Sequence, residues 1–153
     1  MEGKVSQKVF IVHGHDEATK SAVARFVERL DLEAVVLDEQ PSEGLTIIEK
    51  FEKHAGNADF AIVLITPDDV GAPLEKKSDL KLRARQNVIF ELGYFFHALG
   101  RRGVCALYKE GVELPSDIYG VVYVLIDEFD AWQLTLAREM RQAGLSFDAN
   151  KLL

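Results

Sequence analysis

Short apolar runs rich in β-branched residues alternate with segments of helical periodicity from residue 8 to residue 143. The most continuous run, DFAIVLIT at residues 59–66, has the pattern of a parallel strand covered on both faces. Further strands are predicted at residues 8–14, 33–39, 104–108 and 121–126. Because strands alternate with helical segments, the sequence predicts a three-layer α/β/α fold with a five-stranded, mostly parallel sheet.

Four helices are predicted from the spacing of apolar residues. They cover residues 17–30, 47–55, 84–99 and 127–143. Asp16 is the expected N-cap of the first helix, and Gly100 is the expected C-cap of the third. Together these elements predict one domain at residues 8–145, with an N-terminal extension at 1–7 and a C-terminal tail at 146–153.

Ligands of such sheets bind beyond the carboxyl ends of the strands, where loops lead into helices. The loops expected at that edge are residues 13–16, 38–46 and 66–87. A functional site is therefore expected among these three segments.

Composition and charge exclude several kinds of protein. The net charge of −7 argues against a broad nucleic-acid surface, which needs clustered Lys and Arg. The longest apolar stretch, residues 88–99, is too short to span a membrane, and no secretory signal precedes the first strand. The single cysteine, Cys105, is expected to be a buried, inert thiol. We therefore expect a cytoplasmic protein that binds neither nucleic acid nor membrane.

Glu91 is the only acidic residue between residues 79 and 110, in the largely apolar segment NVIFELGYFFHAL. Burying a carboxylate without a partner costs on the order of several kcal/mol, so its presence here needs a reason. Asn87 lies one turn earlier on the same helix face, and Arg83 and Arg85 lie near the helix start. Glu91 is therefore either a functional carboxylate or half of a structural ion pair with an arginine.

The turn after the first strand contains His13, Gly14, His15 and Asp16. Gly14 lets a ligand approach the backbone, and the following helix N-terminus attracts phosphate. The turn is neither a Rossmann fingerprint nor a P-loop, because G-x-G-x-x-G and Gly-Lys-Ser/Thr are both absent. The two histidines are either nucleotide contacts or ordinary turn residues.

Asp68 and Asp69 follow the central strand, where a response-regulator receiver has its phosphoacceptor. A receiver also needs an acidic pair after the first strand, whereas that turn offers histidines and Asp16 alone. Turn and cap roles are therefore predicted for Asp68 and Asp69. No metal site is predicted, because His54 and His97 fall on separate helices and the cysteine stands alone.

Four segments together resemble the bacterial TIR-like nucleotide-binding family: KVFIVHGHDEA, DEQPSEGLT, NADFAIVLITPDD and RARQNVIFELGYF. They occur in the family's order and spacing, and the resemblance extends from Lys8 to about Ala143. It implies a flavodoxin-like TIR topology and an NAD⁺ glycohydrolase that cleaves the bond between nicotinamide and ribose. Family members are often fused to, or encoded with, a sensor of cyclic nucleotides in anti-phage defence. The resemblance therefore also implies a sensor domain or a partner protein that binds a cyclic nucleotide.

The resemblance assigns roles residue by residue, with Glu91 in the place of the family's catalytic glutamate. The residues that match its substrate-binding positions are His13, Gly14, His15, Asp16, Asp38, Arg83, Arg85 and Asn87. The loop that lies over the cleft and mediates TIR–TIR contacts in a homo-oligomer corresponds to Pro41, Ser42, Glu43 and Gly44. NAD⁺ is the implied substrate, with no cofactor and no metal. The tryptophan that animal TIR domains place shortly before the glutamate is absent, so stacking on the base must use another ring or none.

Two other functions remain open at this stage. A non-catalytic module would use the TIR surface for nucleotide binding or self-association, with Glu91 in a structural role. A nucleoside deoxyribosyltransferase-like enzyme is related by fold and by its use of a glutamate. Release of nicotinamide would favour the glycohydrolase, whereas base exchange between deoxynucleosides would favour the transferase.

Overall fold

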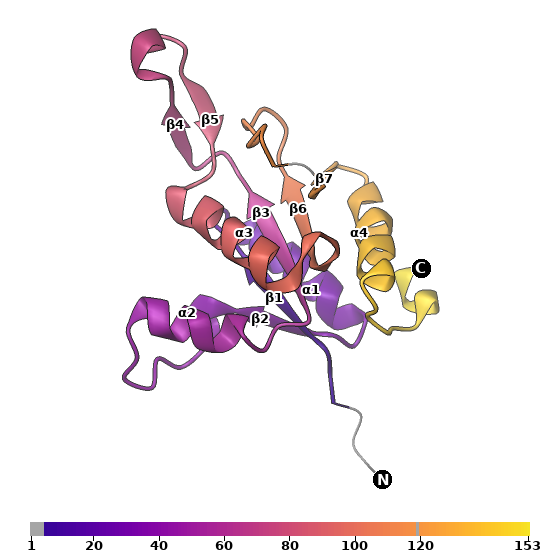
Figure 1. The fold of residues 1–153 in the computed structure, drawn as a ribbon. Helices are drawn as coiled ribbons and strands as arrows, with labels where there is room; N and C mark the ends of the chain where they lie inside the picture. Colours follow the sequence, from indigo (N-terminus) through magenta and orange to yellow (C-terminus); the bar gives the residue numbers. More distant parts are fainter. Residues whose placement is uncertain (1–4, 119) are drawn as a thin grey trace.

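Five parallel strands form the central sheet in the computed structural model, which describes residues 5–118 and 120–153 (Figure 1). They are β1 (Lys8–Val12), β2 (Glu33–Val36), β3 (Phe60–Ile65), β6 (Val104–Tyr108) and β7 (Val122–Leu125). Their spatial order is β2-β1-β3-β6-β7, and all six residues of β3 are buried. The predicted three-layer α/β/α architecture with flavodoxin-like strand order is confirmed.

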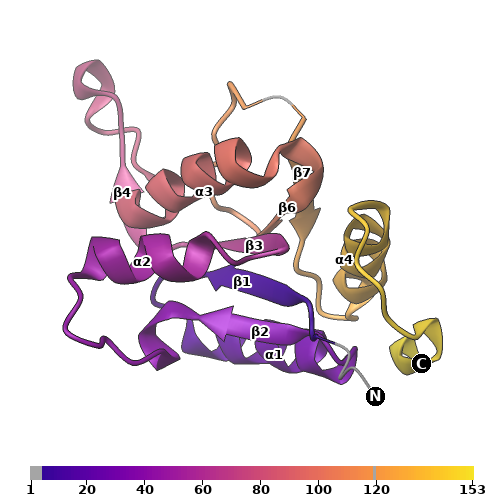
Figure 2. The ribbon, with the colours of Figure 1, turned by 60° about the horizontal axis from the view of Figure 1, so that its bottom comes forward.

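Helices cover both faces of this sheet, as Figures 1 and 2 show. One face carries α1 (Glu17–Arg29) and α4 (Ala131–Gln142), and the other carries α2 (Ile47–Ala55) and α3 (Gln86–Leu99). Strand β1 contributes to both layers because successive side chains point to opposite faces. Val9 and Ile11 pack with the α1 and α4 layer, whereas Phe10 and Val12 pack with the α2 and α3 layer.

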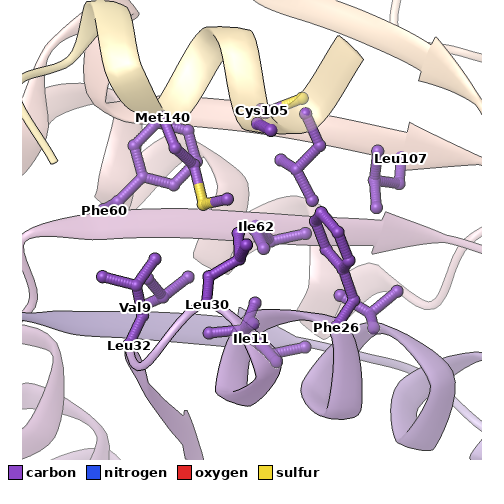
Figure 3. Close-up of a cluster of buried hydrophobic side chains, with 14 of the residues drawn as sticks. Val9, Ile11, Phe26, Leu30, Leu32, Phe60, Ile62, Cys105, Leu107 and Met140 are labelled. Atoms are coloured by element: carbon purple, nitrogen blue, oxygen red, sulfur yellow. The ribbon is translucent and has the colours of Figure 1, made fainter. Parts of the chain in front are cut away.

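Figure 3 shows the apolar layer beneath α1 and α4. Phe26 of α1 packs edge to face on Trp132 of α4, with ring centroids 5.4 Å apart. Cys105 of β6 lies in the same layer, and burial raises the pKa of its thiol to about 12. The thiol is therefore buried and kept protonated, as the sequence predicted.

The C-terminal segment folds back onto this layer. It contains η4 (Ala149–Leu152), and both Phe147 and Leu152 pack against the buried cluster. The backbone N–H of Ser146 donates a 2.7 Å hydrogen bond to the Oε1 atom of Gln7 beside the start of β1. No helix in the described part of the chain is both long enough and apolar enough to cross a membrane.

The first two strands end earlier than predicted. β1 stops at Val12, and β2 stops at Val36, where the chain turns into η1 (Leu37–Glu39). Asp16 caps α1 as expected, because its carboxylate accepts hydrogen bonds from the backbone N–H of Thr19 at 3.0 Å and from the Thr19 hydroxyl at 2.7 Å. The polar residues after β1 and β2 therefore lie at the carboxyl edge of the sheet.

Helix α3 begins at Gln86, two residues later than the predicted start at Ala84. Arg85 is the N-cap residue and has an extended ψ of 147°, so the chain turns into the helix only after it. The C-terminal prediction is confirmed at Gly100, whose φ of 75° is in the left-handed region that glycine tolerates. The short helix η3 (Arg101–Gly103) then leads into β6.

Helix α4 also begins later than predicted, at Ala131 instead of Asp127. The Asp127 carboxylate accepts hydrogen bonds from the backbone N–H groups of Phe129, Ala131 and Trp132 at 3.0, 3.0 and 2.9 Å. These bonds, chiefly that from Ala131, hold the pKa of Asp127 below its ordinary value. The predicted boundary was wrong because Asp127 closes a loop ahead of the helix.

A two-stranded hairpin follows β3 and was not predicted. It consists of β4 (Asp69–Gly71), η2 (Leu74–Lys76) and β5 (Lys81–Arg83), and it projects from the body of the domain (Figure 1). Arg83 lies across Gly71, where an added Cβ would be 2.0 Å from the guanidinium carbon. A hydrogen bond of 2.7 Å from the backbone N–H of Glu113 to the carbonyl oxygen of Leu82 ties β5 to the segment after β6. The strands are too short and too exposed to leave an alternating pattern in the sequence.

Asp68 connects the carboxyl ends of β1 and β3. Its carboxylate accepts hydrogen bonds from the backbone N–H of His15 at 3.1 Å and from the hydroxyl of Thr66 at 2.8 Å. It also lies directly over Gly14, where an added Cβ would be 1.9 Å from Asp68 Oδ2. Asp68 thus shapes the turn, whereas Asp69 begins β4.

We expect Leu92→Ala to lower the free energy of unfolding by about 2–5 kcal/mol, because Leu92 is fully buried and its truncation leaves a cavity. Phe90→Ala, on the exposed side of the same helix, should change it by less than about 0.5 kcal/mol. Urea unfolding of the two variants measures both values. Equal losses of stability in the two variants would contradict the assignment of the Leu92 side of α3 as the side that packs on the sheet.

We expect Gly14→Ala to destabilise the fold by about 1–3 kcal/mol, because its new methyl group would overlap the Asp68 carboxylate. In an Asp68→Ala background the same substitution should have less than about half that effect, since the overlapping group is gone. Unfolding of the four proteins completes the cycle. The same cost in both backgrounds would refute this role of Asp68.

Candidate active site

A cavity of about 360 Å³ opens at the carboxyl edge of the sheet, between the end of β1, the η1 turn, residues 40–46, α2 and α3. Its wall combines apolar side chains with two cations, two carboxylates, a histidine and two neutral polar groups. The lining residues are Phe10, Ile11, His13, Leu37, Asp38, Ser42, Leu45, Ile47, Lys50, Arg85, Asn87 and Glu91. This is the edge at which open parallel sheets bind their ligands.

Glu91 enters the cavity from α3, and its side chain is largely buried. Burial raises the pKa of Glu91 to about 7, and the positive charge of Arg85 opposes that rise. Within residues 5–118 and 120–153, no ion pair joins Glu91 to an arginine or lysine. The described residues therefore do not form the ion pair between Glu91 and an arginine that a structural role would require.

Two predicted neighbours share the cavity with Glu91. Arg85 is the N-cap residue of α3 and is half-buried, and Asn87 follows in the first helical turn. Asn87 and Glu91 are four residues apart and therefore lie on one face of the helix. The helix thus presents a cation, an amide and a carboxylate to the same space.

His13 and Asp38 form the opposite side of the cavity, at the ends of β1 and β2. The Nε2 atom of His13 lies 3.5 Å from Oδ1 of Asp38. Its Nδ1 atom lies 2.9 Å from the carbonyl oxygen of Gly14. The two ring nitrogens of His13 therefore face Asp38 and the Gly14 carbonyl group.

Three residues of the predicted first turn lie outside the cavity lining. Gly14 is covered by Asp68, and His15 is exposed with only its backbone N–H bound to that carboxylate. Asp16 caps α1 through Thr19. Of the first turn, His13 therefore provides the side chain that lines the cavity.

Arg83, which the resemblance assigned to substrate binding, lies on β5 beside a different hollow. That hollow, of about 550 Å³, lies between β5, the start of α3 and residues 113–116. The Glu113 carboxylate in it is exposed and lies 3.7 Å from the Nζ atom of Lys81. Although this hollow is larger, the carboxylate with a strongly raised pKa lies in the 360 Å³ cavity, and we take that cavity as the candidate site.

The predicted assembly loop lies at the mouth of the cavity. Pro41, Ser42, Glu43 and Gly44 are all exposed, and Ser42 also contributes to the cavity wall. A hydrogen bond of 2.8 Å from the backbone N–H of Leu45 to the Ser42 carbonyl oxygen closes a tight turn. Glu43 and Gly44 have φ values of 50° and 76° within it. Glu43 is also paired with Lys53 of α2.

Two features of the cavity were not predicted from the sequence: the Lys50 cation and the apolar wall. Lys50 of α2 lines the cavity three residues after Ile47, on the same helix face. Helix periodicity alone does not distinguish Lys50 from its exposed neighbours. The one signal in the sequence was that Lys50 shares a helix face with Ile47, close to the end of the loop at residues 38–46. In the described residues, no cluster of three or more His, Cys, Asp or Glu side chains is suited to hold a metal ion.

The chain resembles known proteins in sequence. The family model described as "CAP12/Pycsar effector protein, TIR domain" matches residues 8–128. The chain is 51% identical over 149 residues to the uncharacterized protein YuaY of Escherichia coli (strain K12), covering 97% of this chain and 50% of that protein. It is 38% identical over 126 residues to protein tirC of Dictyostelium discoideum, covering 76% and 63%. It is 34% identical over 107 residues to the Pycsar effector protein PaPycTIR of Pseudomonas aeruginosa, covering 69% and 32%.

The chain spans half the length of YuaY and about a third of PaPycTIR, so the comparisons concern one domain of longer proteins. All residues that line the cavity fall within the matched residues 8–128. The resemblance predicted from the sequence motifs is thereby confirmed. The chain belongs to the CAP12/Pycsar effector TIR-domain family, the TIR effectors of bacterial anti-phage defence.

Proposed function

We propose that this domain is an NAD⁺ glycohydrolase that cleaves the bond between nicotinamide and ribose. The supporting observation is Glu91, a largely buried carboxylate without an ion-pair partner among the described residues, in a cavity at the carboxyl edge of the sheet. In this proposal NAD⁺ is the substrate, and the reaction needs neither a metal nor a further cofactor.

The chemistry suits a single carboxylate. Nicotinamide in NAD⁺ is already a cationic leaving group, so its departure needs no general acid. The remaining task is to stabilise positive charge on the anomeric carbon of the ribose, and a nearby carboxylate does this electrostatically or by transient covalent capture. Water then attacks the same carbon and gives ADP-ribose. Low local polarity strengthens the effect, because Glu91 is mostly shielded from solvent.

The other polar groups of the cavity suit the rest of a dinucleotide. Arg85 and Lys50 come from different helices and bring two cations to one cavity, which fits the two negative charges of a diphosphate. The Asn87 amide and the Glu91 carboxylate share a helix face, so both can hydrogen-bond the ribose hydroxyls. These contacts would hold the sugar with its anomeric carbon near Glu91.

We extend the proposal to the setting of the domain. Relatives named Pycsar effector protein and CD-NTase-associated protein 12 support an effector role in a cyclic-nucleotide-triggered defence system. A sensor domain or a partner protein would bind the cyclic nucleotide. Homo-oligomers would form through TIR–TIR contacts at residues 41–44, which are exposed at the mouth of the cavity. The unpaired thiol of Cys105 suits a reducing cytoplasm.

Glu91→Gln should reduce nicotinamide release by about 10²–10³-fold or more, because the amide cannot stabilise the charge that develops on the ribose. The measurement is nicotinamide release at high protein concentration or with a crowding agent, which favours an assembled form. Glu52→Gln, an exposed carboxylate of α2 outside the cavity, is the matched control and should keep wild-type activity. Wild-type rates in a folded Glu91→Gln protein would reject the role of Glu91.

Stability measurements show whether that loss reflects the chemistry or the fold. The raised pKa means that Glu91 keeps its proton in the folded state between pH 4.5 and about 7, where the unfolded chain loses it. The contribution of this group to stability therefore falls as the pH rises through that window. Glu91→Gln should be more stable than wild type at pH 8, by on the order of 3 kcal/mol, and should match it at pH 4.

The same pKa predicts the pH dependence of the reaction. If the carboxylate is the active form, kcat/KM should be half its plateau value near pH 7 and should fall about tenfold per pH unit below that. Arg85→Gln should move the midpoint to a higher pH, because the Arg85 charge favours the ionised form of Glu91. Values of kcat/KM from pH 5 to 9, measured at NAD⁺ concentrations well below KM, check both statements. A profile that is flat from pH 5 to 8 would contradict them.

A further inference from the structure

Lys20 of α1 is a buried cation that the proposed reaction does not use. Its exposed fraction is 7%, and within the described part of the chain it is the only buried residue that carries a charge. It does not line the 360 Å³ cavity. A buried ammonium group is costly unless carboxylates surround it, so its partners indicate what it does.

Three carboxylates surround the Nζ atom of Lys20. Oε2 of Glu17, one turn earlier on α1, lies 2.5 Å away. Oδ2 of Asp38 lies 3.6 Å away, and Oε1 of Glu39 lies 3.9 Å away, both in the η1 turn after β2. The hydrogen bond to Glu17, together with the nearby carboxylates, raises the pKa of Lys20 against the effect of burial, so the group stays charged. Lys20 thus joins α1 to the turn that begins the loop over the cavity.

Asp38 connects Lys20 to the cavity. One of its oxygens faces Lys20, and the other lies 3.5 Å from Nε2 of His13, while both Asp38 and His13 line the cavity that holds Glu91. Lys20 therefore reaches the cavity through one intermediate side chain, without touching the space itself.

The loop that follows has few other anchors near its start. Gln40 donates a 3.2 Å hydrogen bond from its backbone N–H to the Leu37 carbonyl oxygen, and its side-chain amide lies 3.5 Å from the Val36 carbonyl oxygen. Asp38 and Glu39 are otherwise more than half exposed. Without a cation beneath them, these two carboxylates would repel each other and turn towards water.

We propose that Lys20 is a positioning residue that fixes Asp38 and the start of the loop at residues 40–46, and thereby sets how well the cavity receives NAD⁺. The effect on catalysis rests on the proposed glycohydrolase function, whereas the effect on the loop does not. Lys20→Met keeps the apolar stem and removes the charge. Lys20→Arg keeps the charge and is the conservative variant. Lys151→Met, which removes an ion pair with Asp31 at the C-terminal segment, is the matched control.

Hydrogen exchange monitored by mass spectrometry tests the positioning directly. Lys20→Met should accelerate exchange of the amides at residues 37–46 by roughly tenfold and leave β3 unchanged, whereas Lys20→Arg and Lys151→Met should match wild type. Asp38→Asn should accelerate the same amides, and adding Lys20→Met to it should have a smaller further effect than in the wild-type background, because the Lys20–Asp38 contact is already weakened and the longer Lys20–Glu39 contact remains to be lost. Unchanged exchange at residues 37–46, or equal acceleration throughout the chain, would overturn the proposal.

Nicotinamide release separates this inference from the proposed function. For Lys20→Met we expect KM for NAD⁺ to rise roughly tenfold and kcat to change by less than about threefold, with both restored in Lys20→Arg. If kcat falls as far as in Glu91→Gln while KM stays unchanged, the positioning role in binding is wrong. If the loop responds as expected but the wild-type protein releases no nicotinamide, the positioning stands and the glycohydrolase assignment fails.

Discussion

The cost of placing a carboxylate in a mostly apolar surrounding shapes the candidate site. Glu91 lies on a helix whose neighbouring residues, such as Leu92 and Phe95, are fully buried, yet no cation pairs with it among the described residues. Arg85 is near enough to lower its pKa but not to form an ion pair. The result is an acid that ionises near neutral pH in a space large enough for a ligand. Such a group is costly to the fold and useful to a reaction that creates positive charge.

The parallel sheet brings the other parts of the site together. Because β1, β2 and β3 run in the same direction, their carboxyl ends and the following loops meet at one edge. His13 comes from the first loop, Asp38 from the second, and Asp68 shapes the turn between β1 and α1 without entering the cavity. Lys20 connects this edge to the helix layer on the other face of the sheet.

Much of this arrangement could be predicted from the sequence. The continuous apolar run of β3 and the regular alternation of strands and helices predicted the sheet and its layers. Glu91 stood out as the single acidic residue of NVIFELGYFFHAL, because an acidic residue in an apolar helix can be recognised without knowing which residues surround it in the fold. The proximity of Asn87 and Glu91 followed from helical spacing, whereas Arg85 was expected only near the start of the helix. The parallel-sheet rule placed the loops after β1 and β2 at the same edge as the segment before α3, and the family resemblance singled out His13 and Asp38 within them.

What could not be predicted depends on contacts distant in sequence. The β4–β5 hairpin rests on a few backbone bonds and on Arg83 lying across Gly71, neither of which leaves a periodic pattern. Gly14 suggested room for a ligand, but that room is filled by Asp68, 54 residues later. Lys50 and Lys20 differ from the surface lysines only in what surrounds them after folding. A helical pattern predicts that a lysine lies near the solvent boundary, not which carboxylates or which cavity it meets.

The role of Glu91 is tested by following its side-chain carboxyl carbon by NMR as a function of pH, with and without a non-hydrolysable NAD⁺ analogue. We expect a titration midpoint near pH 7 for the free protein and a clear change of the Glu91 signal when the analogue binds. A midpoint near 4.5, the ordinary value for glutamate, together with a signal that does not respond to the analogue, would contradict this role.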